Sequence, residues 1–232
     1  MESSVFLAVT AHEMEEFLPE RLAYMACHFS PYNNGLSNIP SSLPAGSILL
    51  LDDSMPVQEH DPRLVTEQLL ELANRFSLHA VLLDFQNEPT AAGAEIAAAI
   101  AEALPCPVAV TEQYGALKNC PVFLAPPPVN TPLNTYLAPW LERGIFLEIA
   151  PDGLQITVTE QGAQQAPLPS GAVCNLQRQD TRLHCHYRVE VLPKKAVFTL
   201  HRTREDALAM ADQALQLGVR AAVGLYQELE KR

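Results

Sequence analysis

The feature that most constrains this chain is a repeated alternation between short apolar runs and longer segments of helical periodicity. The runs are rich in leucine and β-branched residues, and polar residues follow most of them directly. Such alternation is typical of parallel α/β proteins, because consecutive parallel strands need a crossover connection that is usually a helix. Eight runs are predicted as strands, over residues 5–10, 47–53, 80–85, 107–111, 121–125, 144–149, 196–201 and 220–226.

Most of these runs are apolar along their whole length and do not alternate with polar residues. Continuous apolar strands are expected where helices cover one side of a sheet and a packed barrel interior lies on the other. The eight strands therefore predict an α/β fold, a (β/α)8 TIM-like barrel. This barrel should be somewhat irregular, because only nine residues separate Thr111 from Pro121 and a full crossover helix does not fit there.

Two of the connecting helices carry clear signals at their ends. Asp61-Pro62 supplies an N-cap acceptor and a proline for the first helical position. Thr203 and Asp206 have the spacing of a capping box, and Gly218 stands where a left-handed residue would end the same helix. We therefore expect helices that begin after Asp61 and after Thr203.

Residues 154–191 depart from the barrel pattern. Polar and apolar residues alternate over 155–159 and again over 183–191, which is the period of a strand with one exposed face. This pattern predicts an antiparallel β insertion between the sixth and seventh barrel strands. The whole chain, 1–232, is predicted to be a single barrel domain that carries this hairpin-like insertion.

The negative net charge of the chain argues against some classes of binding partner. Fifteen Lys and Arg residues against 27 Asp and Glu give a formal charge of −12, which repels nucleic acid and anionic membranes at long range. The sequence has no apolar run of about 20 residues, the length that a spanning helix needs. We therefore expect no nucleic-acid or membrane partner, while the oligomeric state stays open.

The cysteines and the glycines bear on location and cofactors. The five cysteines are odd in number and never spaced as Cys-x-x-Cys, which argues against a disulfide framework and a zinc ribbon. The first residues lack the basic segment of a secretory signal, and no glycine-rich phosphate loop follows a predicted strand. We therefore expect a cytoplasmic protein with no metal and no other cofactor.

In barrels of this type the active site forms at the carboxyl ends of the strands. Carboxylates stand at six of the eight predicted strand ends. They can accept hydrogen bonds from sugar hydroxyls, and one of raised pKa can protonate a glycosidic oxygen. The alternative interpretation is that charged residues only mark where strands reach solvent. The predicted catalytic residues are Asp84, Glu88 and Glu112. The predicted ligand-binding residues are Asp53, Gln86, Tyr114, Glu148, Arg202, Tyr226 and Gln227.

An amphipathic helical segment over 64–76 leads to a strand that ends in Asp84-Phe85-Gln86, and Pro89 follows shortly after. This segment resembles the helix and strand before the catalytic site of family-18 glycoside hydrolases, the chitinase-like TIM barrels, whose strand ends in Asp-x-Asp-Trp-Glu. Asp84 matches the second aspartate and Phe85 the aromatic residue, while Leu82 replaces the first aspartate. The resemblance implies a barrel that acts on a carbohydrate.

The sequence departs from the family pattern at the position of the catalytic general acid. The family's general-acid glutamate falls on Gln86, and a neutral amide has no proton to give, so the family mechanism would need Glu88 displaced into that position. Tyr226 would take the place of an aromatic residue that lines the sugar site at the closing strand. The family carries its motif on the fourth barrel strand, whereas the eight predicted strands place Asp84 on the third.

Three functions therefore stay open. The first is a barrel that binds and hydrolyses a carbohydrate, with Asp84, Glu112 and Glu148 as its working carboxylates. Its general acid would be Glu88 or Glu112. The second, favoured by Gln86, is a catalytically inactive barrel that acts as a ligand-binding or protein-interaction module. The third is a cation-dependent lyase or hydrolase, and it requires four carboxylates to converge: Asp52, Asp53, Asp84 and Glu112.

Overall fold

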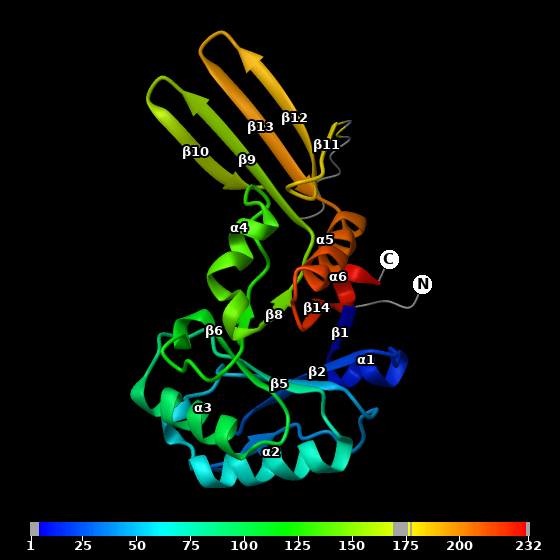
Figure 1. The fold of residues 1–232 in the computed structure, drawn as a ribbon, viewed down its shortest axis with the longest axis vertical. Helices are drawn as coiled ribbons and strands as arrows, with labels where there is room; N and C mark the ends of the chain where they lie inside the picture. The colour runs from blue at the N-terminus through cyan, green and yellow to red at the C-terminus, as the bar shows by residue number, and fades with distance from the viewer. Residues whose placement is uncertain (1–4, 169–175, 177, 231–232) are drawn as a thin grey trace.

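Eight parallel strands form a closed ring in the computed structural model, which describes residues 5–168, 176 and 178–230 (Figure 1). The ring closes because β1 pairs in parallel with both β14 and β2. A short strand, β3 (Leu36–Ser37), adds to β2 in the antiparallel direction. The ring order is β1 (Val5–Val9), β2 (Leu22–Phe29), β4 (Ile48–Asp52), β5 (Ala80–Asp84), β6 (Val108–Thr111), β7 (Val122–Leu124), β8 (Ile145–Glu148) and β14 (Ala221–Leu225). The prediction of a TIM-like α/β barrel is confirmed.

Two strand assignments from the sequence are wrong, and they offset each other in the count of eight. The second barrel strand, β2, was not predicted, because its sequence LAYMACHF contains no β-branched residue. The predicted seventh barrel strand, 196–201, belongs instead to a separate antiparallel sheet. With β2 included, β5 becomes the fourth barrel strand, so Asp84 lies on the strand where the family-18 resemblance places it.

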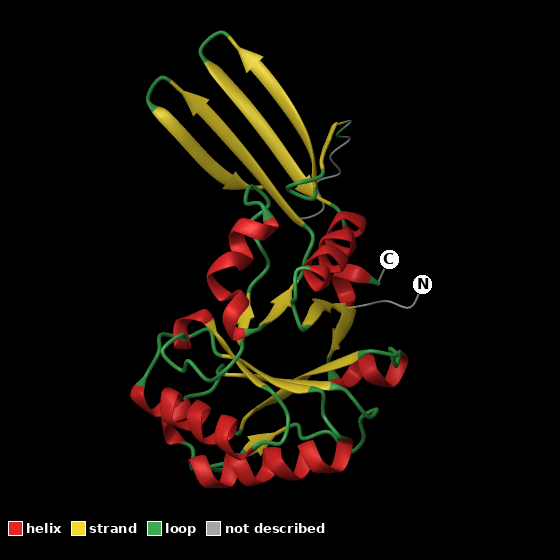
Figure 2. Cartoon of the chain, in the orientation of Figure 1, coloured by secondary structure: helices red, strands yellow, loops and turns green. Residues whose placement is uncertain are grey.

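Helices surround the barrel (Figure 2). The predicted caps are present: the Asp61 side chain accepts a hydrogen bond from the amide of Arg63, and Thr203 and Asp206 form a capping box. Between β6 and β7 a single 3-10 turn, η2, stands in place of a full helix. The α-helices are α1 (Ala11–Glu16), α2 (Pro62–Phe76), α3 (Ala91–Ala103), α4 (Leu133–Leu137), α5 (Arg204–Gln216) and α6 (Tyr226–Leu229). The 3-10 helices are η1 (Val57–Glu59), η2 (Glu112–Tyr114) and η3 (Ala138–Arg143).

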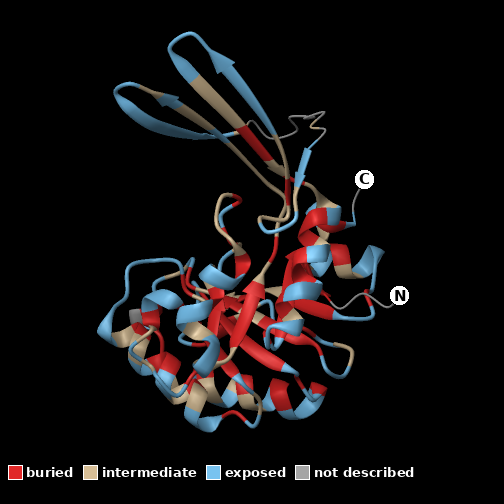
Figure 3. Ribbon diagram, turned by 45° about the horizontal axis from the view of Figure 1, so that its top comes forward, coloured by how far each residue is buried: buried red, intermediate tan, exposed pale blue. Residues whose placement is uncertain are grey.

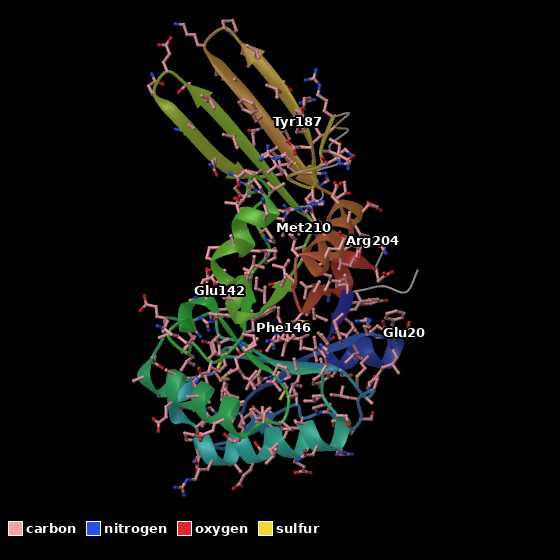
Figure 4. The ribbon with its side chains drawn as sticks, in the orientation of Figure 1. Glu20, Glu142, Phe146, Tyr187, Arg204 and Met210 are labelled. Atoms are coloured by element: carbon pink, nitrogen blue, oxygen red, sulfur yellow. The ribbon has the colours of Figure 1, made fainter. Side chains whose placement is uncertain are left out.

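Buried residues concentrate on the barrel strands and on the helices packed against them (Figure 3). Their apolar side chains form an inner and an outer layer. The inner layer fills the barrel and includes Ile48, Leu82, Ala109 and Phe146. Figure 4 shows Phe146 within the barrel at β8. The outer layer lies between the strands and the helices, and it forms two clusters. Successive side chains of a strand point to opposite faces, so the inner layer identifies which residues of each strand point into the barrel.

A five-stranded antiparallel sheet projects from the barrel beyond α4 and α5, on the side away from α2 and α3 (Figure 1). It confirms the predicted β insertion, but it connects β8 to β14, the seventh and eighth barrel strands, and not the sixth and seventh. The numbering changes because β2 was missed and β13 was counted in the barrel. In hydrogen-bonded order the strands are β10 (Gly162–Pro167), β9 (Asp152–Thr159), β13 (Lys195–Arg202), β12 (Cys185–Leu192) and β11 (Arg178–Asp180). Among the described residues no helix has both the length and the apolar character needed to cross a membrane.

Candidate functional site

The strand register brings polar side chains together at the carboxyl ends of β5 to β8. Leu83 pairs with Val110, and Phe123 pairs with both Thr111 and Phe146. Asp84, one residue beyond Leu83, therefore stands at the same level as Thr111 and Phe123. Asp84 points into the barrel because Leu82, two residues earlier, belongs to the inner core.

Two residues further along the chain from Asp84, Thr111, Phe123 and Phe146, a second level of side chains forms the rim. These residues are Gln86, Gln113, Ala125 and Glu148. Together with Glu112 and the lower level they line one pocket, whose lining residues are Asp84, Gln86, Thr111, Glu112, Gln113, Phe123, Ala125 and Glu148. The cavity is small, about 50 Å³, which is room for a few water molecules or hydroxyl groups and not for a whole sugar ring.

Asp84 forms the acidic floor of this pocket. Burial raises the pKa of Asp84, a hydrogen bond donated by the Gln86 amide lowers it, and the charges of Asp52 and Asp53 raise it further. The hydrogen bond from Gln86 favours the ionised carboxylate, because a charged carboxylate accepts such a bond more strongly than a neutral carboxyl does, but the pKa of Asp84 is still raised overall. Gln86 thus supports Asp84 with a donor at the position where the family carries an acid.

Glu148 stands at the rim on β8 and is the most perturbed carboxyl of the pocket. Burial, then the charges of Asp84 and Glu228, raise the pKa of Glu148 to about 7. Among the described residues no side chain or amide donates a hydrogen bond to its carboxyl group, so nothing there offsets the cost of ionisation. At neutral pH, Glu148 is therefore partly protonated, which is the state that a general acid needs.

Tyr136 of α4 lies near two glutamates of the pocket, Glu112 and Glu148. Its hydroxyl group donates a hydrogen bond of 2.9 Å to the carbonyl oxygen of Ala125, which lines the pocket. Burial, then the charges of Glu112 and Glu148, raise the pKa of Tyr136 to about 12. Tyr136 therefore stays neutral and adds a hydroxyl group near the acidic rim.

Asp53, predicted to bind ligand, supports the backbone behind the pocket. It is buried, and its two carboxylate oxygens accept hydrogen bonds from the amides of Gln86, at 2.8 Å, and Asn87, at 3.0 Å. The Asn87 side chain donates in return to the carbonyl oxygen of Asp53, at 2.6 Å. Asp53 thus fixes the turn that carries Gln86. Glu88, predicted to be catalytic, is exposed and lines a different pocket with Asn87.

Two more predicted ligand-binding residues, Tyr114 and Arg202, are buried and do not line the pocket that contains Asp84. Tyr114 packs edge-on against Phe85, with ring centroids 5.6 Å apart. Arg202 is fully buried in β13, and its guanidinium group donates hydrogen bonds to three backbone carbonyls at the base of the projecting sheet. The acceptors are Pro127 at 2.6 Å, Leu183 at 3.2 Å and His184 at 3.3 Å.

At the closing strand, Tyr226 stacks on Phe17 with ring centroids 4.8 Å apart, and Gln227 is exposed on α6. Four of the ten predicted site residues therefore line the pocket: Asp84, Gln86, Glu112 and Glu148. The pocket also contains Thr111 and Gln113, which were not predicted. Their signal in the sequence is their position two and four residues after Ala109, an inward-facing residue of β6; Thr111 ends that strand and Gln113 lies in η2.

The cation-dependent alternative finds no support in the geometry. Within the described ranges, no three His, Cys, Asp or Glu residues lie close enough together to hold a metal ion. Asp53, which that alternative requires, is engaged by the amides of Gln86 and Asn87. Asp52 accepts a hydrogen bond from the amide of Ser54, at 2.8 Å.

Comparison with known proteins gives a fold and no sequence relative. No protein-family model and no curated protein matches the chain. The spore cortex-lytic enzyme SleL of Bacillus cereus matches over 100% of this chain and 72% of its own, with 9% identity and a TM-score of 0.54. A GH18 chitinase from Cycas revoluta in complex with (GlcNAc)3 matches over 94% and 93%, with 10% identity and a TM-score of 0.56.

A chitinase-like agglutinin from Robinia pseudoacacia matches over 94% of this chain and 93% of its own, with 13% identity and a TM-score of 0.52. Identities this low establish the architecture alone. The three matches agree with the closed ring of eight parallel strands. The chain therefore has the chitinase-like TIM-barrel fold, as the segment around Asp84 had indicated.

Proposed function

We propose that the mouth of this barrel binds a carbohydrate or a related polyol through the rim residues Gln86, Gln113 and Glu148 together with Glu112. The observation that carries the proposal is the convergence of three carboxylates and two amides on one pocket, from the end of β5 and the residues just after it, from η2 and from β8. Such a set accepts and donates hydrogen bonds at once, which suits ligands with many hydroxyl groups.

The size of the cavity defines the binding mode. At about 50 Å³ it admits a hydroxyl group or water, so a sugar ring would lie across the rim and direct polar groups toward Asp84. The Cycas chitinase of the same fold holds (GlcNAc)3, and the Robinia protein is an agglutinin. These two proteins make N-acetylglucosamine oligomers the first ligands to test.

The presence of glutamine at position 86 favours a protein that binds carbohydrate without using the family's catalytic mechanism. Gln86 stands where the resemblance places the general acid, and it is used to hydrogen bond Asp84. A barrel that binds carbohydrate through this pocket needs no proton donor at that position. The proposal therefore covers the inactive, ligand-binding reading of the sequence.

Isothermal titration of the full chain with (GlcNAc)3 tests the proposal. Replacing Asp84→Asn or Glu112→Gln should weaken binding by about tenfold or more, since each removes a charged hydrogen-bond acceptor. Glu88→Gln is the matched control, because it makes the same chemical change at an exposed glutamate outside the pocket. Absence of saturable binding, or equal affinity in Asp84→Asn and the unmodified protein, would contradict the proposal.

A further inference from the structure

We propose that a groove at the amino-terminal end of the barrel binds an apolar organic anion, a carboxylate or sulfonate that carries a hydrocarbon tail. Its basic end lies at the starts of β6, β7, β8 and β14, whereas the carbohydrate site proposed above lies at the carboxyl ends of the strands. The two sites are therefore at opposite ends of the barrel, and this inference does not depend on the carbohydrate proposal.

The groove exists because the connection between β6 and β7 has no full helix. The 3-10 turn η2 and a loop over 115–121 replace it, and two cavities of about 640 and 220 Å³ open between this loop, α3 and the strand starts. The cavities share three lining residues, Ala101, Asn119 and Cys120, so they form one continuous groove. Its volume is in the range of pockets that hold small molecules, about 300–1,000 Å³.

The larger part of the groove has mainly small and apolar walls. Ala98 and Ala101 of α3 line one side, and Ala116 and Leu117 of the loop line the other. Cys120 is a buried free cysteine, which packs as a small apolar group. A hydrocarbon chain suits this part, because it leaves water without bringing an unpaired polar group with it.

The smaller part of the groove is basic. Arg143 and Arg220 both line it, and neither forms an ion pair with any residue that the structure describes. Lys118 and Glu102 line the larger part, so three of the four charged residues along the groove are basic, in a chain with 27 acidic and 15 basic residues. Two like charges that share so small a cavity repel each other, and an anion bound beside them relieves this repulsion.

The two arginines are held in different ways. The guanidinium group of Arg143 donates hydrogen bonds to the carbonyl oxygens of Gly115 and Leu117, each at 2.8 Å, and of Cys120, at 2.8 and 3.2 Å. These bonds fix its position and occupy all but one of its N–H groups, while its charge stays unpaired. The guanidinium group of Arg220 forms no hydrogen bond with the described residues, so its fork of donors is free to bind a carboxylate in a bidentate manner.

Gly144 allows Arg220 to lie against the backbone beside Arg143. A Cβ atom at position 144 would stand 2.5 Å from Nε of Arg220. The backbone φ of Gly144 is +82°, which also favours glycine. The fold therefore holds the two guanidinium groups at the same end of the groove.

Isothermal titration of the full chain with octanoate tests the site. We expect saturable binding with a Kd on the order of 100 µM, and binding about tenfold weaker or more for acetate, which lacks the tail, and for octanol, which lacks the charge. Arg220→Met should weaken octanoate binding by about tenfold or more, whereas Arg63→Met, the same change at an exposed arginine of α2, should leave it unchanged. Ala98→Phe should fill the groove and weaken binding, whereas Ala103→Phe, at an exposed alanine of α3 outside the groove, should not.

The outcomes separate this site from the carbohydrate site. Absence of saturable octanoate binding, or equal affinity in Arg220→Met and the unmodified protein, would overturn the groove proposal. Equal affinity for octanol would show that the arginines recognise no anion, and equal affinity for acetate would show that the apolar walls contribute nothing; either result would also overturn it. Binding of (GlcNAc)3 without octanoate binding would contradict the groove alone, and the reverse result would contradict the carbohydrate site alone.

Discussion

Replacing Glu148 by glutamine should change how the stability of the protein depends on pH, with no ligand present. In the folded chain the pKa of Glu148 lies at about 7, above its ordinary value of 4.5. Between these two values the folded state keeps a proton that the unfolded state releases, so the free energy of unfolding falls as pH rises through this window. At about 1.36 kcal/mol per pH unit, the full effect is on the order of 3 kcal/mol.

Urea denaturation of the unmodified protein and of Glu148→Gln, measured from pH 4 to pH 8.5, gives the difference directly. We expect the two curves to run parallel below about pH 4.5 and the difference between them to shift above it, by about 2–3 kcal/mol in favour of the variant at pH 8. Glu88→Gln, at an exposed position, should follow the unmodified protein throughout. If the difference between Glu148→Gln and the unmodified protein does not change with pH, then Glu148 titrates normally and the account of the rim is wrong.

Three further predictions concern the residues that build the frame of the site. Arg202→Met leaves three backbone carbonyls, one buried and two partly buried, without their donor and should cost about 3–5 kcal/mol in urea denaturation, whereas Arg188→Met, which breaks an exposed ion pair, should cost less than about 1 kcal/mol. A loss of carbohydrate affinity without destabilisation in Arg202→Met would restore Arg202 as a ligand-binding residue. Asp53→Ala removes the acceptor of two amides and should cost about 2 kcal/mol by the same assay while weakening (GlcNAc)3 binding, because the turn that carries Gln86 loosens; unchanged affinity would refute that coupling. Thr203→Ala removes the N-cap of α5 and should lower stability by about 1 kcal/mol, and an unchanged midpoint would show that the capping box contributes nothing.

The sequence predicts the class of fold, but it does not predict that β2 is a strand or that β13 lies outside the barrel. Apolar runs flanked by capped helices indicate parallel α/β structure, because each signal is local. The β2 sequence LAYMACHF is stabilised as a strand by pairing with β1 and β4 on either side, which is a tertiary contact. The β13 sequence shows its strand period clearly, but a strand's own residues do not say which sheet it joins.

The same limit explains which site residues were found. A polar residue that ends an apolar run marks a strand end, and this signal was enough to place Asp84, Gln86, Glu112 and Glu148 in one group. It gives no direction for the side chain. Arg202 and Tyr114 also follow or end strand-like segments, yet they point into packed interiors where carbonyls and an aromatic ring surround them. The position of polar residues in the sequence therefore predicts at which end of the barrel the site lies, but not which of these residues line the pocket.

The residues that line the pocket are found by taking every second residue along each strand from one that points into the barrel. The sequence alone does not show which residues point inward. Both faces of a barrel strand are apolar, one against the interior and one against the helices, so no alternation of polarity marks the inward face. The structure shows that Leu82 and Phe146 point into the barrel. Two residues after each of them stand Asp84 and Glu148, which therefore point to the same side. The same count from Ile48 gives Asp52, and it turns the neighbouring Asp53 outward, where its carboxylate meets backbone amides. A shift of one residue along the strand thus decides whether an aspartate at the strand end faces the mouth of the barrel or hydrogen bonds to the loop behind it.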